Sequence, residues 1–309
     1  MVKRPRSDDE SSESDVCDEE SEPDLTAEPE TPPAHAHPEA YAALKEAARA
    51  CSVIGFRVPD HQPNISLHAY RQTVDWLLFV SNALRYEPYT FFLAAQLFAR
   101  YLAVERIMCD VHIQLYAVTC LWVAAKLEEV ARVDAELLIC FHTYGVCNLS
   151  RAVKAERRLL TLLGYEVTRP TVYHFLPAYD WVCSDRVRRT AMYLAHVSCF
   201  SNDLLREVPH AIAATCVFLS VLAHDGAWTS QLRKVDGFEH AALRPMARRL
   251  LNTCFALHAH DTVCARFDAE HGEFIDKVAS QMGLRPAAPQ LHRLAVGEPG
   301  LAGPRVTHA

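Results

Sequence analysis

Glycine and long apolar runs are both scarce in this 309-residue chain, which contains only 10 glycines. A β-architecture rich in turns uses glycine freely, so the composition favours helices. The longest apolar stretches, residues 116–125 and 212–223, fall short of the roughly 18 residues that a membrane-spanning helix needs. No apolar signal-peptide core lies near the N-terminus, where Lys3 and Arg4 are followed by acidic residues. We therefore expect a soluble intracellular protein, nuclear or cytoplasmic, with no membrane partner.

Motifs for metal binding and catalysis are also missing. The chain has 11 cysteines but no C-x-x-C pair, and the close pairs His35/His37 and His258/His260 have no partner at zinc spacing. It has no glycine-rich nucleotide loop, no H-E-x-x-H sequence and no nucleophile elbow. We therefore predict no metal, no cofactor and no enzymatic activity, and we expect the cysteines to be reduced core residues.

Negative charge is concentrated at the N-terminus. Residues 1–33 contain 12 acids and three bases, a net charge of −9, so the total of −7 leaves +2 for the rest, which shows no stripe for nucleic acid. Such an acidic segment buries too little apolar surface to fold, so we expect residues 1–38 to form a disordered regulatory tail. The alternative is an arm that only solvates the protein. The candidate phosphorylation sites, chosen for neighbouring acids or a following proline, are Ser7, Ser12, Ser21 and Thr31.

Apolar spacing predicts two successive sets of helices. They fall at residues 41–49, 71–86, 91–103, 113–127, 134–143 and 150–163, then at 172–182, 186–200, 210–224 and 239–257, with a short turn at 228–233. Pro88 interrupts the pattern, and Thr90 is placed to cap the helix that follows. The segments 113–127 and 210–224 are apolar all round, so each is expected at the centre of a helical domain.

The predicted fold class is therefore all-α, with two tandem five-helix domains. We place the first domain at residues 39–168, including a preceding short helix, and the second at 169–285. Residues 286–309, rich in proline and alanine, are expected to form a flexible extension.

An ordered series of short motifs resembles the cyclin box. The series is V-D-W-L at 74–77, F-A-R-Y-L at 98–102, A-A-K-L-E-E at 124–129, A-E-R-R-L-L at 155–160, Y-E-V at 165–167 and P-T at 170–171. Residues 191–195 and 208–213 are similar to the second box of A- and B-type mitotic cyclins. The resemblance extends over about residues 65–282, so both predicted domains are identified as cyclin-box domains.

The resemblance implies a regulatory subunit that binds and activates the catalytic subunit of a cyclin-dependent serine/threonine kinase, as a heterodimer, in cell-cycle control. The lysine and glutamate that reach the kinase in that family fall on Lys126 and Glu156. By the same carry-over, the neighbouring contacts are Val123, Leu127, Glu128, Leu160 and Tyr165. Without the resemblance, both charges have simpler explanations. Lys126 would be favourable at any helix C-terminus, and Glu156 could pair in solvent with Lys154 or Arg157.

The chain departs from the family at the hydrophobic patch that docks substrates and inhibitors. The matching residues are Trp76, Gln114 and Leu115. The apolar patch positions are instead occupied by Ala69, Gln72 and Thr73. Asp110 occupies a position that is basic in the family. In the family an arginine of the first helix pairs with an aspartate of the second. Here Ala99 replaces that aspartate, and Arg71 is displaced by one position from the arginine. A patch with less apolar area predicts weak or altered binding of Arg-x-Leu motifs.

Two other functions remain open on the sequence alone. Basal transcription factors of the TFIIB type carry two cyclin-like boxes, but they also have a zinc ribbon and a basic surface, for which this sequence gives no sign. A cyclin-fold scaffold that acts without a kinase is the other alternative, and the presence of Lys126 and Glu156 argues against it.

Overall fold

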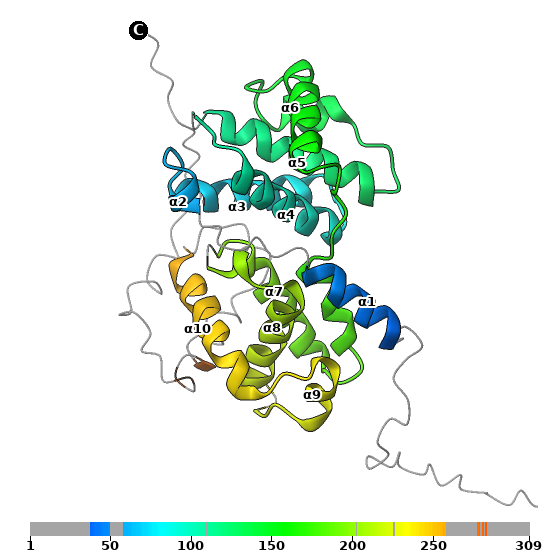
Figure 1. The fold of residues 1–309 in the computed structure, drawn as a ribbon, viewed down its shortest axis with the longest axis vertical. Helices are drawn as coiled ribbons and strands as arrows, with labels where there is room; N and C mark the ends of the chain where they lie inside the picture. The colour runs from blue at the N-terminus through cyan, green and yellow to red at the C-terminus, as the bar shows by residue number, and fades with distance from the viewer. Residues whose placement is uncertain are drawn as a thin grey trace, which may run out of the picture. The chain divides into compact units, whose positions relative to one another are not determined.

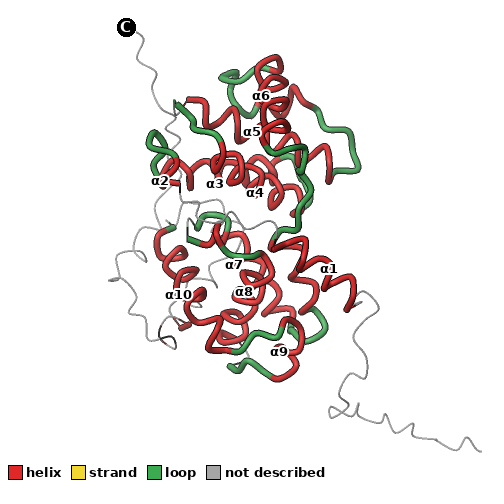
Figure 2. The backbone as a smooth tube through the Cα atoms, viewed as in Figure 1, coloured by secondary structure: helices red, strands yellow, loops and turns green. Residues whose placement is uncertain are grey.

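The computed structural model describes residues 38–49, 58–108, 111–201, 203–224 and 226–257, together with residues 277, 278, 280 and 282. Regular structure in these ranges is entirely helical, as Figure 2 shows, and this confirms the predicted fold class. Asp110, the extension 286–309 and the four candidate phosphorylation sites lie outside the described residues, as does the predicted tail up to residue 37.

The helices follow one another in the order that the apolar pattern predicts. The first set comprises α1 (Pro38–Arg49), α2 (Val58–His61), α3 (Leu67–Ala83), α4 (Pro88–Val104), α5 (Val111–Glu128), the π-helix η1 (Leu137–Phe141) and α6 (Leu149–Leu162). The second comprises the 3₁₀-helix η2 (Val172–Tyr179), α7 (Asp185–Ser198), the 3₁₀-helix η3 (Leu204–Arg206), α8 (Pro209–His224), α9 (Ser230–Asp236) and α10 (His240–Ala256).

Helix α5 is the centre of the first group. Helices α3, α4, η1 and α6 all contact it, and Figure 1 shows α3 to α6 gathered together. Every side chain from Ala117 to Ala125 is buried. The polar Thr119 is accommodated because its hydroxyl donates to the carbonyl of Leu115 one turn earlier, at 2.7 Å. A helix apolar on all faces is thus enclosed by its neighbours, as predicted.

Helix α8 has the same role in the second group. It contacts η2, α7 and α10, and all side chains from Pro209 to Val221 are buried. Helix α1 also contacts α8, and the ring of Tyr41 meets Phe175 of η2 edge to face at 5.7 Å. Figure 1 shows α1 beside this second group. The short helix that precedes the first box in sequence therefore packs against the second.

Direct hydrogen bonds join the two groups. The hydroxyl of Tyr70 on α3 donates to the carbonyl of Cys199 at 3.0 Å, and Arg71 Nε donates to the carbonyl of Phe200 at 3.4 Å. On α4, Gln96 Nε2 donates to the carbonyl of Pro170 at 2.9 Å. In these three bonds the donor is a side chain of the first group and the acceptor is a main-chain carbonyl of the second group. The identity of the residue therefore matters only on the side of the first group.

Three local expectations were wrong. Helix α4 begins at Pro88 rather than after Thr90, because proline suits the first helical position, where its missing N–H is not needed. Thr90 lies inside α4 and donates its hydroxyl to Glu129. The segment 172–182 instead forms the 3₁₀-helix η2, which ends at Tyr179 and contains Pro177, a residue without a main-chain N–H to donate. The predicted turn at 228–233 is largely helix α9, which Thr229 caps.

The expected 134–143 helix is also different in kind. Asp134 Oδ1 accepts the N–H groups of Glu136 and Leu137 at 3.0 Å each and starts the segment. The chain then widens into η1, in which the N–H of His142 reaches back five residues to the carbonyl of Leu137 at 3.4 Å. Single π-turns of this kind are frequent at functional sites.

Three further properties can be stated for the described ranges. No helix in them combines the length and apolar character that crossing a membrane requires. No three or more His, Cys, Asp or Glu side chains in them are grouped to hold a metal ion. The seven cysteines they contain are free thiols, and five of these are buried, as expected for core residues.

Candidate functional site

Lys126 and Glu156 come together at the surface of the first group. Lys126 lies in the last turn of α5 and forms an ion pair with Glu156 Oε1 on α6. Its side chain is 38% exposed and that of Glu156 is 19% exposed. Glu156 therefore pairs across two helices with Lys126, rather than with Lys154 or Arg157 on its own helix.

An aromatic ring supports the lysine. Nζ of Lys126 lies 3.8 Å from the ring centroid of Trp122, one helical turn earlier on α5. The ring face attracts the ammonium and limits its positions. Sequence reasoning missed this contact, although the spacing of four residues on a helix was a usable signal. Trp122 and Glu156 together hold Lys126 in one place.

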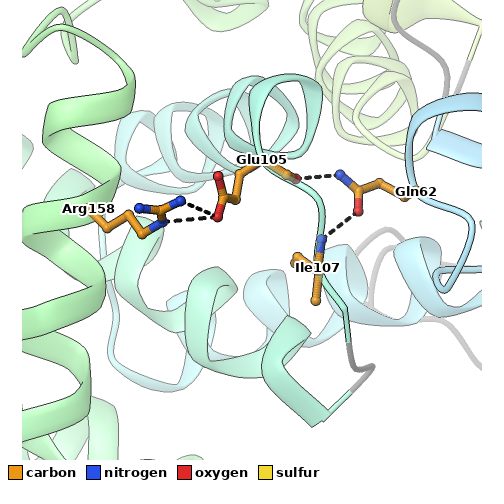
Figure 3. A network of polar contacts seen from close by, with 4 residues as sticks. All are labelled: Gln62, Glu105, Ile107 and Arg158. Carbon is orange, nitrogen blue, oxygen red and sulfur yellow. Dashed lines mark hydrogen bonds and ion pairs between the residues drawn. The ribbon is translucent and has the colours of Figure 1, made fainter.

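A polar network sets the position of α6. Arg158 donates to Glu105 Oε1 from Nε at 2.9 Å and from its terminal nitrogen at 2.6 Å (Figure 3). The carbonyl of Glu105 accepts from Gln62 Nε2 at 2.6 Å, and Gln62 Oε1 accepts the N–H of Ile107 at 2.9 Å. The turn after α4 is thus held by Gln62 on one side and by Arg158 of α6 on the other. Arg158 lies about half a helical turn from Glu156, so this network also fixes the part of α6 that carries Glu156.

The predicted apolar neighbours of the pair differ in exposure. Leu127 is 45% exposed, Tyr165 is 68% exposed and Leu160 is half-buried. Val123 is only 3% exposed and packs in the core, so it cannot offer a surface without rearrangement. Leu127, Leu160 and Tyr165 are the apolar residues of the predicted set that a partner can reach.

The backbone presents Tyr165 outward. Both Gly164 and Tyr165 have φ 62°, in the left-handed region. The N–H of Tyr165 bonds to the carbonyl of Leu160 at 2.8 Å and so closes the C-terminus of α6. A non-glycine residue in this region is strained, so an exposed tyrosine there is a candidate for function.

Exposed apolar side chains are concentrated in the stretch of sequence that contains this site. Of eleven large hydrophobic residues exposed in the described ranges, eight lie between residues 127 and 165. They are Leu127, Val130, Leu137, Phe141, Tyr144, Val146, Val153 and Tyr165. Of these, Leu127 and Tyr165 belong to the predicted set next to Lys126 and Glu156, whereas Phe141 ends η1, and Tyr144 and Val146 lie in the turn between η1 and α6.

Two acidic residues follow Lys126 at the end of α5. Burial, and then the neighbouring Glu129, raise the pKa of the half-buried Glu128 carboxyl. Glu129 accepts hydrogen bonds from Thr90 and from the N–H of Glu87 at 2.9 Å, so it fastens the start of α4. Of the two, Glu128 is the one open to a partner.

The predicted docking patch is poorly apolar. Trp76 and Gln114 are half-buried and Leu115 is 7% exposed. Thr73 is buried and donates its hydroxyl to the carbonyl of Ala69 at 2.7 Å, whereas Gln72 is exposed. Arg71, displaced by one position in the sequence, donates to the carbonyl of Phe200 in the second group.

Comparisons with known proteins agree with this architecture. The family model "Cyclin, N-terminal domain" matches residues 40–168, and "Cyclin, C-terminal domain" matches residues 170–278. Cyclin-A3-2 of Oryza sativa is 29% identical over 181 residues, which cover 55% of this chain and 46% of that protein. The G2/mitotic-specific cyclin-B of Emericella nidulans is 26% identical over 230 residues, 73% of this chain and 45% of that protein. The chain thus spans about half the length of the curated relatives that it matches.

Solved structures share the fold. The viral cyclin from herpesvirus saimiri superposes with a TM-score of 0.59 and 13% identity, over 69% of this chain and 95% of that chain. A chain of the yeast RNA Pol II CTD kinase CTDK-1 complex superposes with a TM-score of 0.53 and 13% identity, over 80% and 84%. At this identity the superpositions establish the fold. Taken with the two family models, which together match well over half of the residues, they show that the chain belongs to the cyclin family.

Proposed function

We propose that this cyclin binds the catalytic subunit of a cyclin-dependent serine/threonine kinase and activates it, with a role in cell-cycle control. The observation that carries the proposal is the partly exposed Lys126–Glu156 pair, together with the reachable apolar side chains of Leu127, which follows Lys126, and of Leu160 on α6 and Tyr165 just after it. Family membership supports a regulatory subunit, and the A- and B-type relatives favour cell-cycle control.

The pair suits recognition of a partner main chain. An ammonium has three donors, and the Trp122 ring and Glu156 leave part of that capacity for partner carbonyls. Only Oε1 of Glu156 bonds to Lys126, so Oε2 can accept from a partner N–H. Because the two charges already neutralise each other, burying them together costs less than burying either alone. The pair therefore provides directional contacts at a modest desolvation cost.

The apolar residues supply the remaining affinity. Each Å² of apolar surface removed from water contributes about 25 cal/mol, and interface energy concentrates in a few central aromatic and aliphatic side chains. Activation follows if the bound kinase favours its active conformation, with its own lysine–glutamate pair and activation loop in place. The cyclin contributes binding energy in this mechanism, and the kinase provides the catalytic groups.

Co-purification with a panel of cyclin-dependent kinases, followed by a histone-kinase assay, tests the proposal. Wild type is compared with Lys126→Glu and Glu156→Ala, and with Lys234→Glu on α9 as a control for an exposed lysine elsewhere. We expect one kinase to bind and be activated by wild type and by the control, and both site variants to lose activation. If no kinase binds folded wild-type protein, the activator function is wrong, and a scaffold or a transcription-factor role takes its place.

A further inference from the structure

A strained turn exposes a tyrosine between η1 and α6. Tyr144 and Gly145 have φ 51° and 76°, and the N–H of Val146 bonds to the carbonyl of Thr143 at 3.0 Å to close the turn. Two left-handed residues in succession favour Asn and Gly, so tyrosine at the first position is unfavourable. Its side chain is nevertheless 91% exposed, and so packing does not offset the strain. An exposed aromatic residue at such a position points to recognition rather than stability.

Hydrogen bonds of the buried residue Thr143 hold the turn in place. Thr143 is fully buried, donates its hydroxyl to the carbonyl of Ile139 and accepts the N–H of Cys147 at 3.1 Å. Ile139 and Cys147 are themselves buried. Phe141, 68% exposed, and Val146, 47% exposed, flank the tyrosine. An apolar tip that is already ordered loses little conformational freedom when a partner binds.

Basic residues lie next to this tip. Arg151, in the first turn of α6, donates to the carbonyl of Val146 at 3.4 Å and joins the helix to the turn. Lys154 is exposed and lies on the same face of α6 as Arg151. At roughly 100° per residue, the two side chains are about 60° apart around the helix axis. Arg158 shares that face, but Glu105 balances its charge (Figure 3). Within the described residues no carboxylate pairs with Arg151 or Lys154, and the positive end of the helix dipole disfavours Arg151 further.

This surface is separate from the proposed kinase contact. Arg151 and Lys154 lie about 140° and 200° around α6 from Glu156, at roughly 100° per residue. They therefore point away from the Lys126–Glu156 pair. A partner on this face can bind while the kinase occupies the other.

We propose that Phe141, Tyr144, Val146, Arg151 and Lys154, the tip–helix surface, bind an acidic peptide segment that carries an aromatic or aliphatic side chain. The uncompensated positive charge selects the acidic residues, and the exposed ring and its apolar neighbours receive the apolar side chain. The segment belongs to protein substrates of the bound kinase, so this inference rests on the proposed function. It supplies a docking site in place of the degenerate patch around Trp76.

Steady-state phosphorylation by the purified kinase–cyclin complex tests the substrate role. Two peptides share one phosphoacceptor site, and one of them also carries an appended segment of six acidic residues around a Phe and a Leu. We expect the appended segment to lower KM about tenfold with wild type, through the higher effective concentration of the substrate. The double variant Arg151→Glu/Lys154→Glu and the single variant Tyr144→Gly should abolish the difference while phosphorylating the plain peptide normally. Arg186→Glu/Arg189→Glu on α7 is the matched charge control and should keep it.

Fluorescence anisotropy with the labelled acidic segment and the cyclin alone gives a second readout, independent of any kinase. Wild type should bind, binding should weaken with added salt, and the two variants should lose it. Because Tyr144→Gly relieves strain, its melting temperature should not fall, so lost binding cannot be explained by unfolding. No binding by wild type, or equal binding by the variants, would overturn the docking site. Binding without any kinase activation would leave the site standing and contradict the proposed function instead.

Discussion

Lys45 of α1 and Asp236 of α9 form an ion pair that joins the first helix to the second box. Their atoms Nζ and Oδ1 are 3.5 Å apart, and the aspartate side chain is only 1% exposed. The hydroxyl of Tyr179 donates to Oδ2 of the same carboxylate at 2.7 Å. Burial first, and then the Asp236 charge, raise the pKa of Tyr41 on α1. A buried carboxylate thus depends on one lysine from a helix nearly two hundred residues earlier.

Removing that lysine should destabilise the protein strongly. Lys45→Met leaves the Asp236 charge buried without a cation, and we expect a loss of about 2–3 kcal/mol in the free energy of unfolding. The double variant Lys45→Met/Asp236→Asn should recover most of it, because no buried charge remains. Urea denaturation measures both, with Lys234→Met on α9 as the control that should stay within about 0.5 kcal/mol of wild type. Equal losses in the single and double variants would show that the charge pair is not the cause.

Gln62 should contribute more to stability than the neighbouring ion pair between Arg158 and Glu105. The residue is 1% exposed, and its amide bonds to the carbonyl of Leu102. The same amide also bonds to the carbonyl of Glu105 and to the N–H of Ile107 (Figure 3). Gln62→Ala leaves two buried main-chain groups and one part-buried carbonyl without their side-chain partner, and we expect a loss of about 2–3 kcal/mol. Arg158→Ala removes a side chain that is 54% exposed, and ion pairs at exposed positions contribute little net stability because solvent screens them. Urea midpoints of the two variants test the order, and a larger effect of Arg158→Ala would contradict it.

The sequence predicted the features that depend on local pattern. Helices α5 and α8 were expected to be central because no face of either is polar, and residues 117–125 and 209–221 are indeed buried. The all-α fold and membership of the cyclin family followed in the same way, since apolar spacing and short motifs can both be recognised without knowledge of tertiary contacts. Lys126 and Glu156 were placed by motif alone.

What the sequence did not predict depends on contacts between distant segments or on backbone detail. Nothing near Asp236 in sequence indicates Lys45, because only the packing of α1 against the second group brings them together. The π-turn of η1 has no local signal in a segment that the apolar pattern predicts as helix, and the left-handed Tyr144 directly follows that segment. Val123 was named by carry-over from the family resemblance, but its position around α5 buries it.

The degenerate patch should bind Arg-x-Leu peptides weakly. Thr73 is buried with its hydroxyl committed to Ala69, and Gln72 offers an exposed amide where the family has an apolar side chain. The loss of one large apolar contact is worth about 1.5–3 kcal/mol, so we expect at least tenfold weaker binding than an A-type cyclin shows. Peptide titration by calorimetry measures it, and Gln72→Leu should recover part of the affinity. Ordinary family-like affinity in wild type would contradict the prediction.

The buried His210 should make the protein sensitive to mild acid. Its ring packs between Phe175 and Phe238, at centroid distances of 5.7 and 5.9 Å, and its Nδ1 bonds to nothing in the described residues. Burial lowers the pKa of His210 below its ordinary value of 6.5; the nearby Asp236 opposes this, whereas Lys45 and Arg49 add to it. The unfolded chain therefore takes up a proton at a pH where the folded protein does not.

This difference in proton uptake determines how the stability of the protein changes with pH. Where the unfolded state binds more protons, stability rises with pH, so the contribution of His210 is complete above about pH 6.5 and is lost as the pH falls below it. One such group changes the free energy of unfolding by at most about 1.4 kcal/mol per pH unit. Burial also lowers the pKa of His174 and His142, so wild type retains other acid-sensitive groups. We therefore expect His210→Phe, which keeps an aromatic ring in the same place, to flatten the fall in urea midpoint between pH 7 and pH 5 without abolishing it. If both proteins lose stability in parallel, His210 does not determine the acid response.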